Sequence, residues 1–312
     1  MKKTYRASID IGSNSVLLLI AEVDGVNVRE VSRKSFITSL GRDLDKNKAF
    51  HPDSMALTLD ALKDYLLETD HFQIPRESIV ATATEASRVA SNSKEFFEEI
   101  KLQYGLNIQT INSLAEAYFS TKGILFNTKF EKEIIIIMDI GGASTEFIKV
   151  STKTFEIFES ISLPVGAVRA SQWLDEDLFV QNLQKIFTDF RAELDHFVTQ
   201  ELYCVAGTMT SLGNMHLGRK EFFEDDVHGL KLKSEDVETI FKKFSSSPPD
   251  VFLSQFPFLG KRSASIKGGL HLVYHIIHRL LVKEMTISTY GLRYGTLLEG
   301  QIKEEFLHVK SI

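Results

Sequence analysis

Residues 133–148 of the chain run from Glu133 to Ile148 and read Glu-Ile-Ile-Ile-Ile-Met-Asp-Ile-Gly-Gly-Ala-Ser-Thr-Glu-Phe-Ile. The apolar run before Asp139 is rich in isoleucine, which is typical of a buried strand. Gly141 and Gly142 then predict a tight turn with positive φ, and Ser144 begins a second strand. The stretch is therefore predicted to form a strand, a glycine turn and a strand.

Such a turn has the chemistry of a phosphate site. Successive backbone N–H groups in a glycine turn can form a cradle for an anion. Asp139 and Glu146 flank the cradle, and carboxylates repel phosphate but bind a divalent metal carried with it. A single Asp-x-Gly-Gly turn is nevertheless more often a structural hairpin without a ligand.

The same pattern occurs a second time. Residues 7–20 read Ala-Ser-Ile-Asp-Ile-Gly-Ser-Asn-Ser-Val-Leu-Leu-Leu-Ile. Asp10 takes the place of Asp139, and Gly12 takes that of Gly141. Two copies in one chain predict two similar halves facing each other across a cleft, each offering a carboxylate and a phosphate cradle. The duplication favours a functional role for both turns.

Composition sets broad limits. The chain has 312 residues, 43% of them hydrophobic, which suits two domains with sizeable cores. Its net charge of −6 gives no reason to expect a nucleic-acid partner. The single cysteine, Cys204, lies in an apolar run and is expected in the core. No signal peptide or membrane-spanning run is recognisable, so a soluble cytoplasmic protein with no membrane partner is expected.

Paired hairpins of this kind resemble the phosphate-binding loops of the superfamily of actin, heat-shock chaperones and sugar kinases. Within it, residues 8–15 and 139–146 are most similar to the exopolyphosphatase / guanosine pentaphosphate phosphohydrolase (Ppx/GppA) family. Further similar segments follow in family order at residues 83–92, 113–118, 163–169, 206–211, 261–269 and 290–295. The resemblance spans residues 9–295 and is closest to the family's short, two-domain form.

The resemblance implies an α/β fold of two similar ribonuclease H-like (actin-like ATPase) domains, each a mixed sheet flanked by helices, with an interdomain cleft. The first domain is expected over residues 1–122 and the second over residues 123–292. A final helix in residues 293–312 is expected to pack back onto the first domain.

The resemblance also assigns roles to particular residues. Glu116 corresponds to the general base that activates water, and Arg88 to an arginine that holds phosphate. From the residues alone, the favoured interpretation of Glu116 is a partner of a helix dipole, and that of Arg88 is a solvated arginine at a helix start; the resemblance reverses both. The phosphate-binding residues implied are Gly12, Ser13, Asn14, Ser15, Gly141, Gly142, Ala143, Ser144, Gly207 and Thr208. The ligands implied for Mg²⁺ are Asp139, Glu146 and Asp10.

The function implied is Mg²⁺-dependent release of terminal orthophosphate from inorganic polyphosphate, guanosine pentaphosphate or both. Expected partners are polyphosphate or guanosine pentaphosphate and tetraphosphate, and a homodimer is allowed. The chain departs from the family at Ala115, Ala143, Ala206 and Ala264. These departures motivate an alternative, a catalytically weakened sensor of polyphosphate or guanosine alarmones. A small-molecule kinase of the same superfamily ranks last.

Some features outside these matches carry expectations of their own. Apolar spacing predicts one long helix over residues 176–200 and another over residues 269–281. His271, His275 and His278 lie on one side of the latter, where they form either a metal site or a set of packing histidines.

Three basic residues and two residues of 163–169 also have alternative interpretations. Lys261, Arg262 and Lys267 either line a channel for a polyanion or form a solvated edge. Gly166 is expected to support a close turn near the cleft. Arg169 is either part of that turn or a surface charge.

Overall fold

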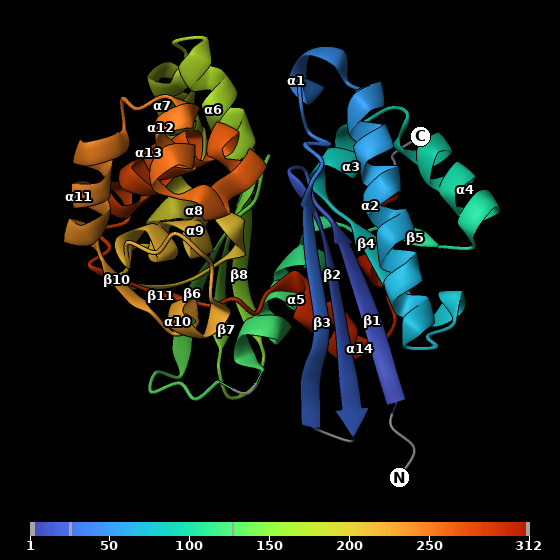
Figure 1. Cartoon of the computed structure of the whole chain (residues 1–312). Coiled ribbons are helices and arrows are strands. Elements are labelled where there is room, and N and C mark those ends of the chain that lie inside the picture. Colours follow the sequence, from blue (N-terminus) through green and yellow to red (C-terminus); the bar gives the residue numbers. More distant parts are fainter. Residues whose placement is uncertain (1–3, 25–26, 127, 310–312) are drawn as a thin grey trace. The chain divides into compact units, whose positions relative to one another are not determined.

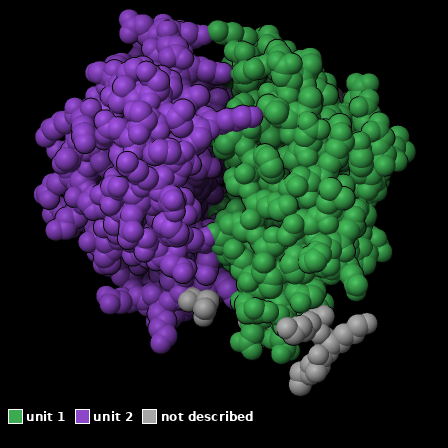
Figure 2. Space-filling model, viewed as in Figure 1, with its two compact units in different colours: residues 1–123, 292–312 green, residues 124–291 purple. Residues whose placement is uncertain are grey.

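The computed structural model of the chain describes residues 4–24, 27–126 and 128–309. It contains two compact units (Figure 2). Unit 1 comprises Met1–Gly123 and Leu292–Ile312, and unit 2 comprises Ile124–Gly291. Within the described residues, every helix is too short or too polar to cross a membrane.

Unit 1 is built on a five-stranded sheet in the order β3-β2-β1-β4-β5 (Figure 1). The strands are β1 (Thr4–Ile11), β2 (Ser15–Asp24), β3 (Asn27–Ile37), β4 (Ile79–Ala83) and β5 (Ile108–Thr110). β1 pairs antiparallel with β2 and parallel with β4, which in turn pairs parallel with β5. The carboxyl ends of β1, β4 and β5 therefore lie at one edge of the sheet.

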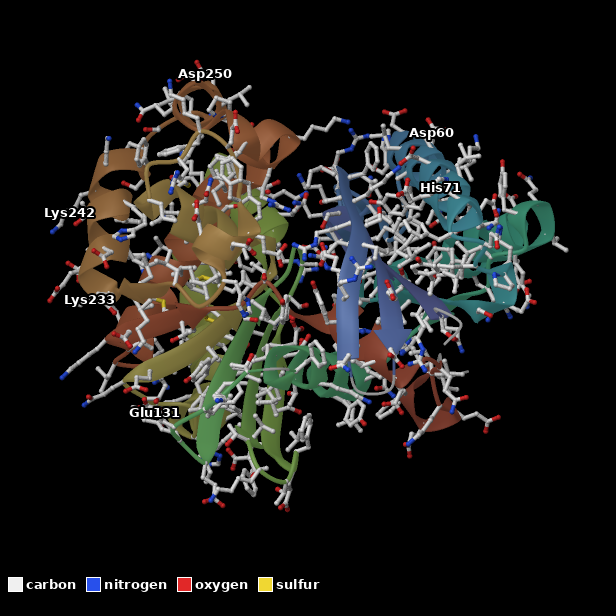
Figure 3. All side chains as sticks on the ribbon, turned by 60° about the horizontal axis from the view of Figure 1, so that its bottom comes forward. Asp60, His71, Glu131, Lys233, Lys242 and Asp250 are labelled. Carbon is white, nitrogen blue, oxygen red and sulfur yellow. The ribbon has the colours of Figure 1, made fainter. Side chains whose placement is uncertain are left out.

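Helices cover both faces of this sheet. They are α1 (Leu44–Asn47), α2 (Pro52–His71), η1 (Arg76–Ser78), α3 (Glu85–Val89), α4 (Ser93–Tyr104), α5 (Ser113–Leu125), α14 (Leu292–Glu299) and η3 (Glu304–Phe306). α2 packs against β2 and β3 and turns Asp60 and His71 outward (Figure 3). Tyr65 of α2 is buried, and its hydroxyl donates a hydrogen bond to the Val16 carbonyl oxygen of β2 at 2.7 Å.

The helix α14 packs on β1, where Ser8 Oγ and Thr296 Oγ1 are 2.6 Å apart. The backbone of α14 also packs directly against the backbone of α5. A Cβ on Gly295 would lie 1.9 Å from the Phe119 carbonyl oxygen, so only glycine fits there. At Gly291, directly before α14, a Cβ would meet only ordinary contacts, the nearest at 3.7 Å.

Unit 2 is built on a six-stranded sheet in the order β10-β11-β9-β6-β7-β8. The strands are β6 (Ile134–Ile140), β7 (Thr145–Ser151), β8 (Ile157–Leu163), β9 (Glu201–Val205), β10 (Lys231–Lys233) and β11 (Glu284–Ile287). The helices are α6 (Ala167–Asp175), α7 (Phe179–Asp189), α8 (Arg191–Asp195), α9 (Ala206–His216), α10 (Glu224–Val227), α11 (Ser234–Phe244), α12 (Pro249–Gln255), η2 (Pro257–Arg262) and α13 (Ser263–Arg279). β6, β9 and β11 are mutually parallel, so their carboxyl ends share an edge.

Two predicted helices in unit 2 had the wrong bounds. The long helix over residues 176–200 is instead the pair α7 and α8, preceded by α6. Asp177 has a φ of 57°, which a continuous right-handed helix does not allow. The other helix begins at Ser263, because the polar residues at its start are also helical.

The two units repeat one topology. The order β3-β2-β1-β4-β5 in unit 1 corresponds to β8-β7-β6-β9-β11 in unit 2. In both, the second antiparallel pair has a register shift, directly after Ile20 in one and directly after Lys149 in the other. Each shift follows the tenth residue after the aspartate of its hairpin, Asp10 or Asp139. The duplication predicted from the hairpins thus extends through each sheet.

Candidate functional site

The two predicted hairpins close in the same way. Gly12 N–H donates to the Ser15 carbonyl oxygen at 2.9 Å, and Gly141 N–H donates to that of Ser144 at 3.0 Å. The predicted positive φ at Gly141 and Gly142 is wrong, because neither has left-handed backbone. A Cβ on Gly141 would lie 3.4 Å from the Ser144 carbonyl oxygen, which is an ordinary contact, so lack of space does not require glycine at this position either.

The first hairpin is held from outside by the loop after β3. Gly41 N–H donates to the Ser13 carbonyl oxygen at 2.7 Å, and Thr38 and Ser39 N–H both donate to that of Asn14 at 3.0 Å. Ser13 itself is buried. The carbonyl groups of the turn are therefore fixed by protein donors, which orients its peptide units.

The second hairpin is gripped by the start of α6. Ala167 N–H donates to the Gly141 carbonyl oxygen at 2.9 Å, and Val168 N–H donates to that of Gly142 at 2.8 Å. A Cβ on Gly166 would lie 2.5 Å from the Gly142 carbonyl carbon. Gly166 thus supports a close backbone approach, as the sequence predicted.

Arg169 fixes the far side of the same hairpin. Its Nη1 donates to the carbonyl oxygens of Ala143 at 2.6 Å and Pro164 at 2.7 Å. The residue is buried, which excludes a surface charge. The guanidinium holds the hairpin by its carbonyl groups.

Two carboxylates lie beside the second hairpin. Asp139 on β6 and Glu146 on β7 are direct cross-strand partners, so their side chains share one face of the sheet. Glu146 is buried and accepts a hydrogen bond from Ser162 Oγ at 2.7 Å. Two carboxylates on one face of the sheet offer the oxygen ligands that Mg²⁺ prefers, and Mg²⁺ keeps several waters beside them.

Asp10, the third predicted metal ligand, belongs to unit 1, where it lies between Leu17 of β2 and Thr82 of β4. Among the residues that the structure describes, no three His, Cys, Asp or Glu side chains are grouped as a ready metal site. The three-ligand set of Asp10, Asp139 and Glu146 stays a prediction.

The predicted catalytic residues meet at the carboxyl edge of the sheet in unit 1. Arg88 is on α3, which follows β4, and Glu116 is in the first turn of α5, which follows β5. Arg88 Nη1 lies 2.5 Å from Glu116 Oε2, and only 8% and 11% of the two side chains are exposed. Arg88 is therefore not a solvated arginine, and Glu116 is more than a partner of the helix dipole.

The electrostatics of Arg88 follow from this burial. Removal from water lowers the pKa of its guanidinium, but the charges of Glu116 and Glu85, together with the hydrogen bonds that Arg88 donates to both, outweigh burial and raise this pKa. Arg88 therefore carries a permanent positive charge. Its helix starts beside the first hairpin, because Thr84 N–H donates to the Ile11 carbonyl oxygen at 3.2 Å.

The third predicted cradle is the start of α9, which follows β9. A Cβ on Gly207 would lie 2.7 Å from Arg262 Cζ, so the absence of a side chain admits the guanidinium. Thr208 is buried against α13, since a Cβ on Gly269 would lie 2.6 Å from its Cγ2. Of the three basic residues in 261–267, these contacts bring only Arg262 to a predicted cradle residue. Lys261 is exposed.

Two of the alanine departures have clear structural settings. Ala115 is fully buried in an apolar cluster with Phe119 and Phe306, so a carboxylate there would be buried among apolar groups. Ala206 has a φ of 69°, a conformation that costs a residue with a Cβ roughly 1–3 kcal/mol and that glycine adopts freely. The first departure removes a buried charge, and the second adds local strain.

The histidines of α13 pack against neighbouring groups. His271 Nε2 is 3.0 Å from the Ser245 carbonyl oxygen, and its ring makes an edge contact with Phe241. His278 Nδ1 is 2.7 Å from the Tyr274 carbonyl oxygen. These contacts support the packing interpretation over a metal site.

Glu85 is a residue of the site that was not predicted from the sequence. Its Oε2 accepts from Arg88 Nη2 at 2.7 Å and from Nε at 3.1 Å. The helix α3 that carries both was also not predicted. The separation of three residues between an acid and a base was the available signal, because such a pair shares one helix face.

Comparison with known proteins identifies the family. The Ppx/GppA phosphatase family matches residues 19–304. The chain belongs to this family. A solved family member from Aquifex aeolicus has a TM-score of 0.75 and 26% identity, covering 96% of this chain and 97% of that one. The predicted class, two similar actin-like α/β domains with mixed sheets flanked by helices, is confirmed.

Relatives within the Ppx/GppA family differ in name and length. Exopolyphosphatase 2 of Mycobacterium tuberculosis is 26% identical over 96% of this chain and 99% of its own length. The guanosine-5'-triphosphate,3'-diphosphate pyrophosphatase of Vibrio cholerae is 27% identical over 98% of this chain and 61% of its own. A bifunctional 3-dehydroquinate synthase/phosphatase of Fusobacterium nucleatum is 29% identical over 95% of this chain. The chain spans 46% of that last relative.

Proposed function

We propose that this Ppx/GppA protein is a Mg²⁺-dependent phosphohydrolase that releases terminal orthophosphate from inorganic polyphosphate, guanosine pentaphosphate or both. The observation that carries the proposal is the buried pair of Arg88 and Glu116 beside the first hairpin. It combines a carboxylate suited to proton transfer with a permanent cation suited to phosphate. The names of the relatives support the two substrates, and the cytoplasm is the proposed compartment.

In this reaction Glu116 accepts a proton from water as the water oxygen attacks the terminal phosphorus. The phosphoanhydride P–O bond breaks, and the leaving phosphate keeps the electron pair. General-base assistance of this kind is typically worth about 10²–10⁴ in rate. Arg88 stabilises negative charge on the phosphoryl oxygens, since a guanidinium binds phosphate oxygens strongly.

The two glycine hairpins are the proposed phosphate cradles, Gly12 to Ser15 in unit 1 and Gly141 to Ser144 in unit 2. Their carbonyl groups are bound by protein donors, which leaves peptide units held in fixed orientations. Gly207 and Thr208 at the start of α9 form the third cradle, with Arg262 next to it.

Asp139 and Glu146 would hold Mg²⁺ in unit 2, and Asp10 remains a predicted further ligand. When bound, the ion supplies positive charge that neutralises phosphate oxygens.

Orthophosphate release measured with short polyphosphate, long polyphosphate and guanosine pentaphosphate, each with and without Mg²⁺, tests the proposal. We expect release from at least one substrate, and only when Mg²⁺ is present. Calorimetry with the same ligands should run in parallel. Tight binding without release would overturn the proposal in favour of a sensor, and ATP-dependent phosphorylation of a sugar or acid would favour a kinase.

A further inference from the structure

The guanidinium of Arg88 is occupied on every nitrogen by groups of unit 1. Nε and Nη2 donate to Glu85 Oε2 at 3.1 and 2.7 Å. Nη1 donates to the Ile111 carbonyl oxygen at 2.8 Å and lies 2.5 Å from Glu116 Oε2. These contacts engage four of the five N–H donors of the guanidinium, and the fifth is the second N–H of Nη2. A phosphate bound by two parallel N–H groups, the strong geometry for arginine, would take that N–H together with one from Nη1, so Nη1 must release a protein partner.

The two carboxylates hold Arg88 differently. Glu85 binds two nitrogens from a position on the same helix, three residues earlier, so its contact moves together with Arg88. Glu116 binds one nitrogen from a different helix, and the Ile111 carbonyl oxygen shares that nitrogen. An incoming phosphate oxygen most readily replaces the single contact at Nη1.

This difference has a chemical consequence for Glu116. A carboxylate in contact with a guanidinium is a weaker proton acceptor than the same carboxylate after the guanidinium has moved to another anion. A phosphate that takes Nη1 would therefore free Glu116 just when a proton must be removed from water. Between substrates the base would stay paired.

We propose that Glu85 is a positioning residue that keeps Arg88 in place while its Nη1 passes from Glu116 to an oxygen of bound phosphate. This inference rests on the proposed function, because it assigns the order of events at the same site. Without Glu85, the guanidinium is free to turn and present two nitrogens to Glu116, the geometry in which arginine and carboxylate bind most strongly. The base would then be harder to free.

The first test observes Arg88 directly, without turnover. The side-chain ¹⁵N resonances of Arg88, assigned with Arg88→Lys, are followed while orthophosphate is added to the full-length protein. In the wild type we expect the Nη resonances to move and the Nε resonance to stay. In Glu85→Ala, the Nε resonance should already differ before phosphate is added. Nη resonances unchanged at the highest phosphate concentration would overturn the inference, whether or not the protein hydrolyses any anhydride.

The second test separates positioning from substrate binding. Glu85→Ala should lower kcat by about 10- to 100-fold, the range seen when a partner that orients a functional group is removed, with little change in KM. Glu85→Gln, which keeps the shape and an acceptor oxygen, should recover part of that loss. Glu98→Gln, an exposed glutamate on α4, is the matched control and should behave as wild type.

The outcomes of the two proposals can be told apart. A wild-type protein that releases no orthophosphate from any substrate refutes the proposed hydrolase, while the resonance experiment still decides the partner exchange. A wild-type protein that hydrolyses substrate, with Glu85→Ala equally active, refutes the role of Glu85 alone.

Discussion

Asp139 of β6 lies directly opposite Glu146 of β7, which places two carboxylates on one face of the sheet beside the second glycine hairpin. A cation bound by this pair would stabilise the folded state by mass action, by about 2.7 kcal/mol at 100 times its Kd. We therefore expect MgCl₂ to raise the melting temperature of the wild type. Asp139→Asn and Glu146→Gln should each lose most of that rise, and EDTA should reverse it.

Glu156→Gln is the control for this measurement, because Glu156 is an exposed glutamate of the same unit. It should keep the full response to MgCl₂. An undiminished rise in Asp139→Asn would show that the metal is bound elsewhere.

Glu116→Gln tests the base. The amide keeps the size of the side chain but does not accept a proton from water at neutral pH, so orthophosphate release should fall by about 10²–10⁴. Binding of the substrate, measured by calorimetry, should change little. A variant as active as wild type would remove Glu116 from the mechanism.

Much of this architecture could be predicted from sequence, for physical reasons that differ between elements. The hairpins at Asp10 and Asp139 were predictable because an apolar strand, an acid and a glycine turn are adjacent in the chain. Their matching bulges were not, because a register shift depends on pairing between strands. The prediction of a single helix over residues 176–200 was wrong, because the apolar spacing continues across residues where the chain is not helical.

The candidate site shows the same limit. Arg88 and Glu116 were named separately from two segments, but their direct contact depends on the adjacency of β4 and β5. Glu85 was not predicted because the helix that carries it has only five residues, which is too short for apolar spacing to indicate a helix. The importance of Gly295 depends on Phe119, a residue far away in sequence.

Gly295 and Gly291 offer a matched pair of substitutions. Alanine normally stabilises a helix by about 1 kcal/mol relative to glycine. Gly295→Ala should instead destabilise the protein, because its Cβ would lie 1.9 Å from the Phe119 carbonyl oxygen. We expect a loss of about 1–3 kcal/mol or more, as for overpacking elsewhere. Urea unfolding measures it, and Gly291→Ala, with ordinary contacts, should cost much less.

His271 predicts a dependence of stability on pH. Burial lowers the pKa of this imidazole below its ordinary 6.5, the hydrogen bond with the Ser245 carbonyl oxygen opposes that, and the charge of Lys267 lowers it further. The unfolded chain therefore binds the proton more readily than the folded one. The stability contributed by neutral His271 is present above the unfolded pKa and is lost as pH falls toward the folded pKa.

His271→Gln removes this titration. The free energy of unfolding of the wild type minus that of the variant should be constant above about pH 7.5 and should shrink as pH falls below 6.5. Urea unfolding between about pH 5 and pH 8 measures the difference. A difference that does not vary with pH would contradict this assignment.

The matching register shifts after Ile20 and Lys149 give the chain an internal standard. A substitution made in one half has a counterpart at the equivalent position of the other half, in the same local backbone. The two effects can then be subtracted within one polypeptide. The difference between the two effects measures how far the two halves have diverged in function from their common topology.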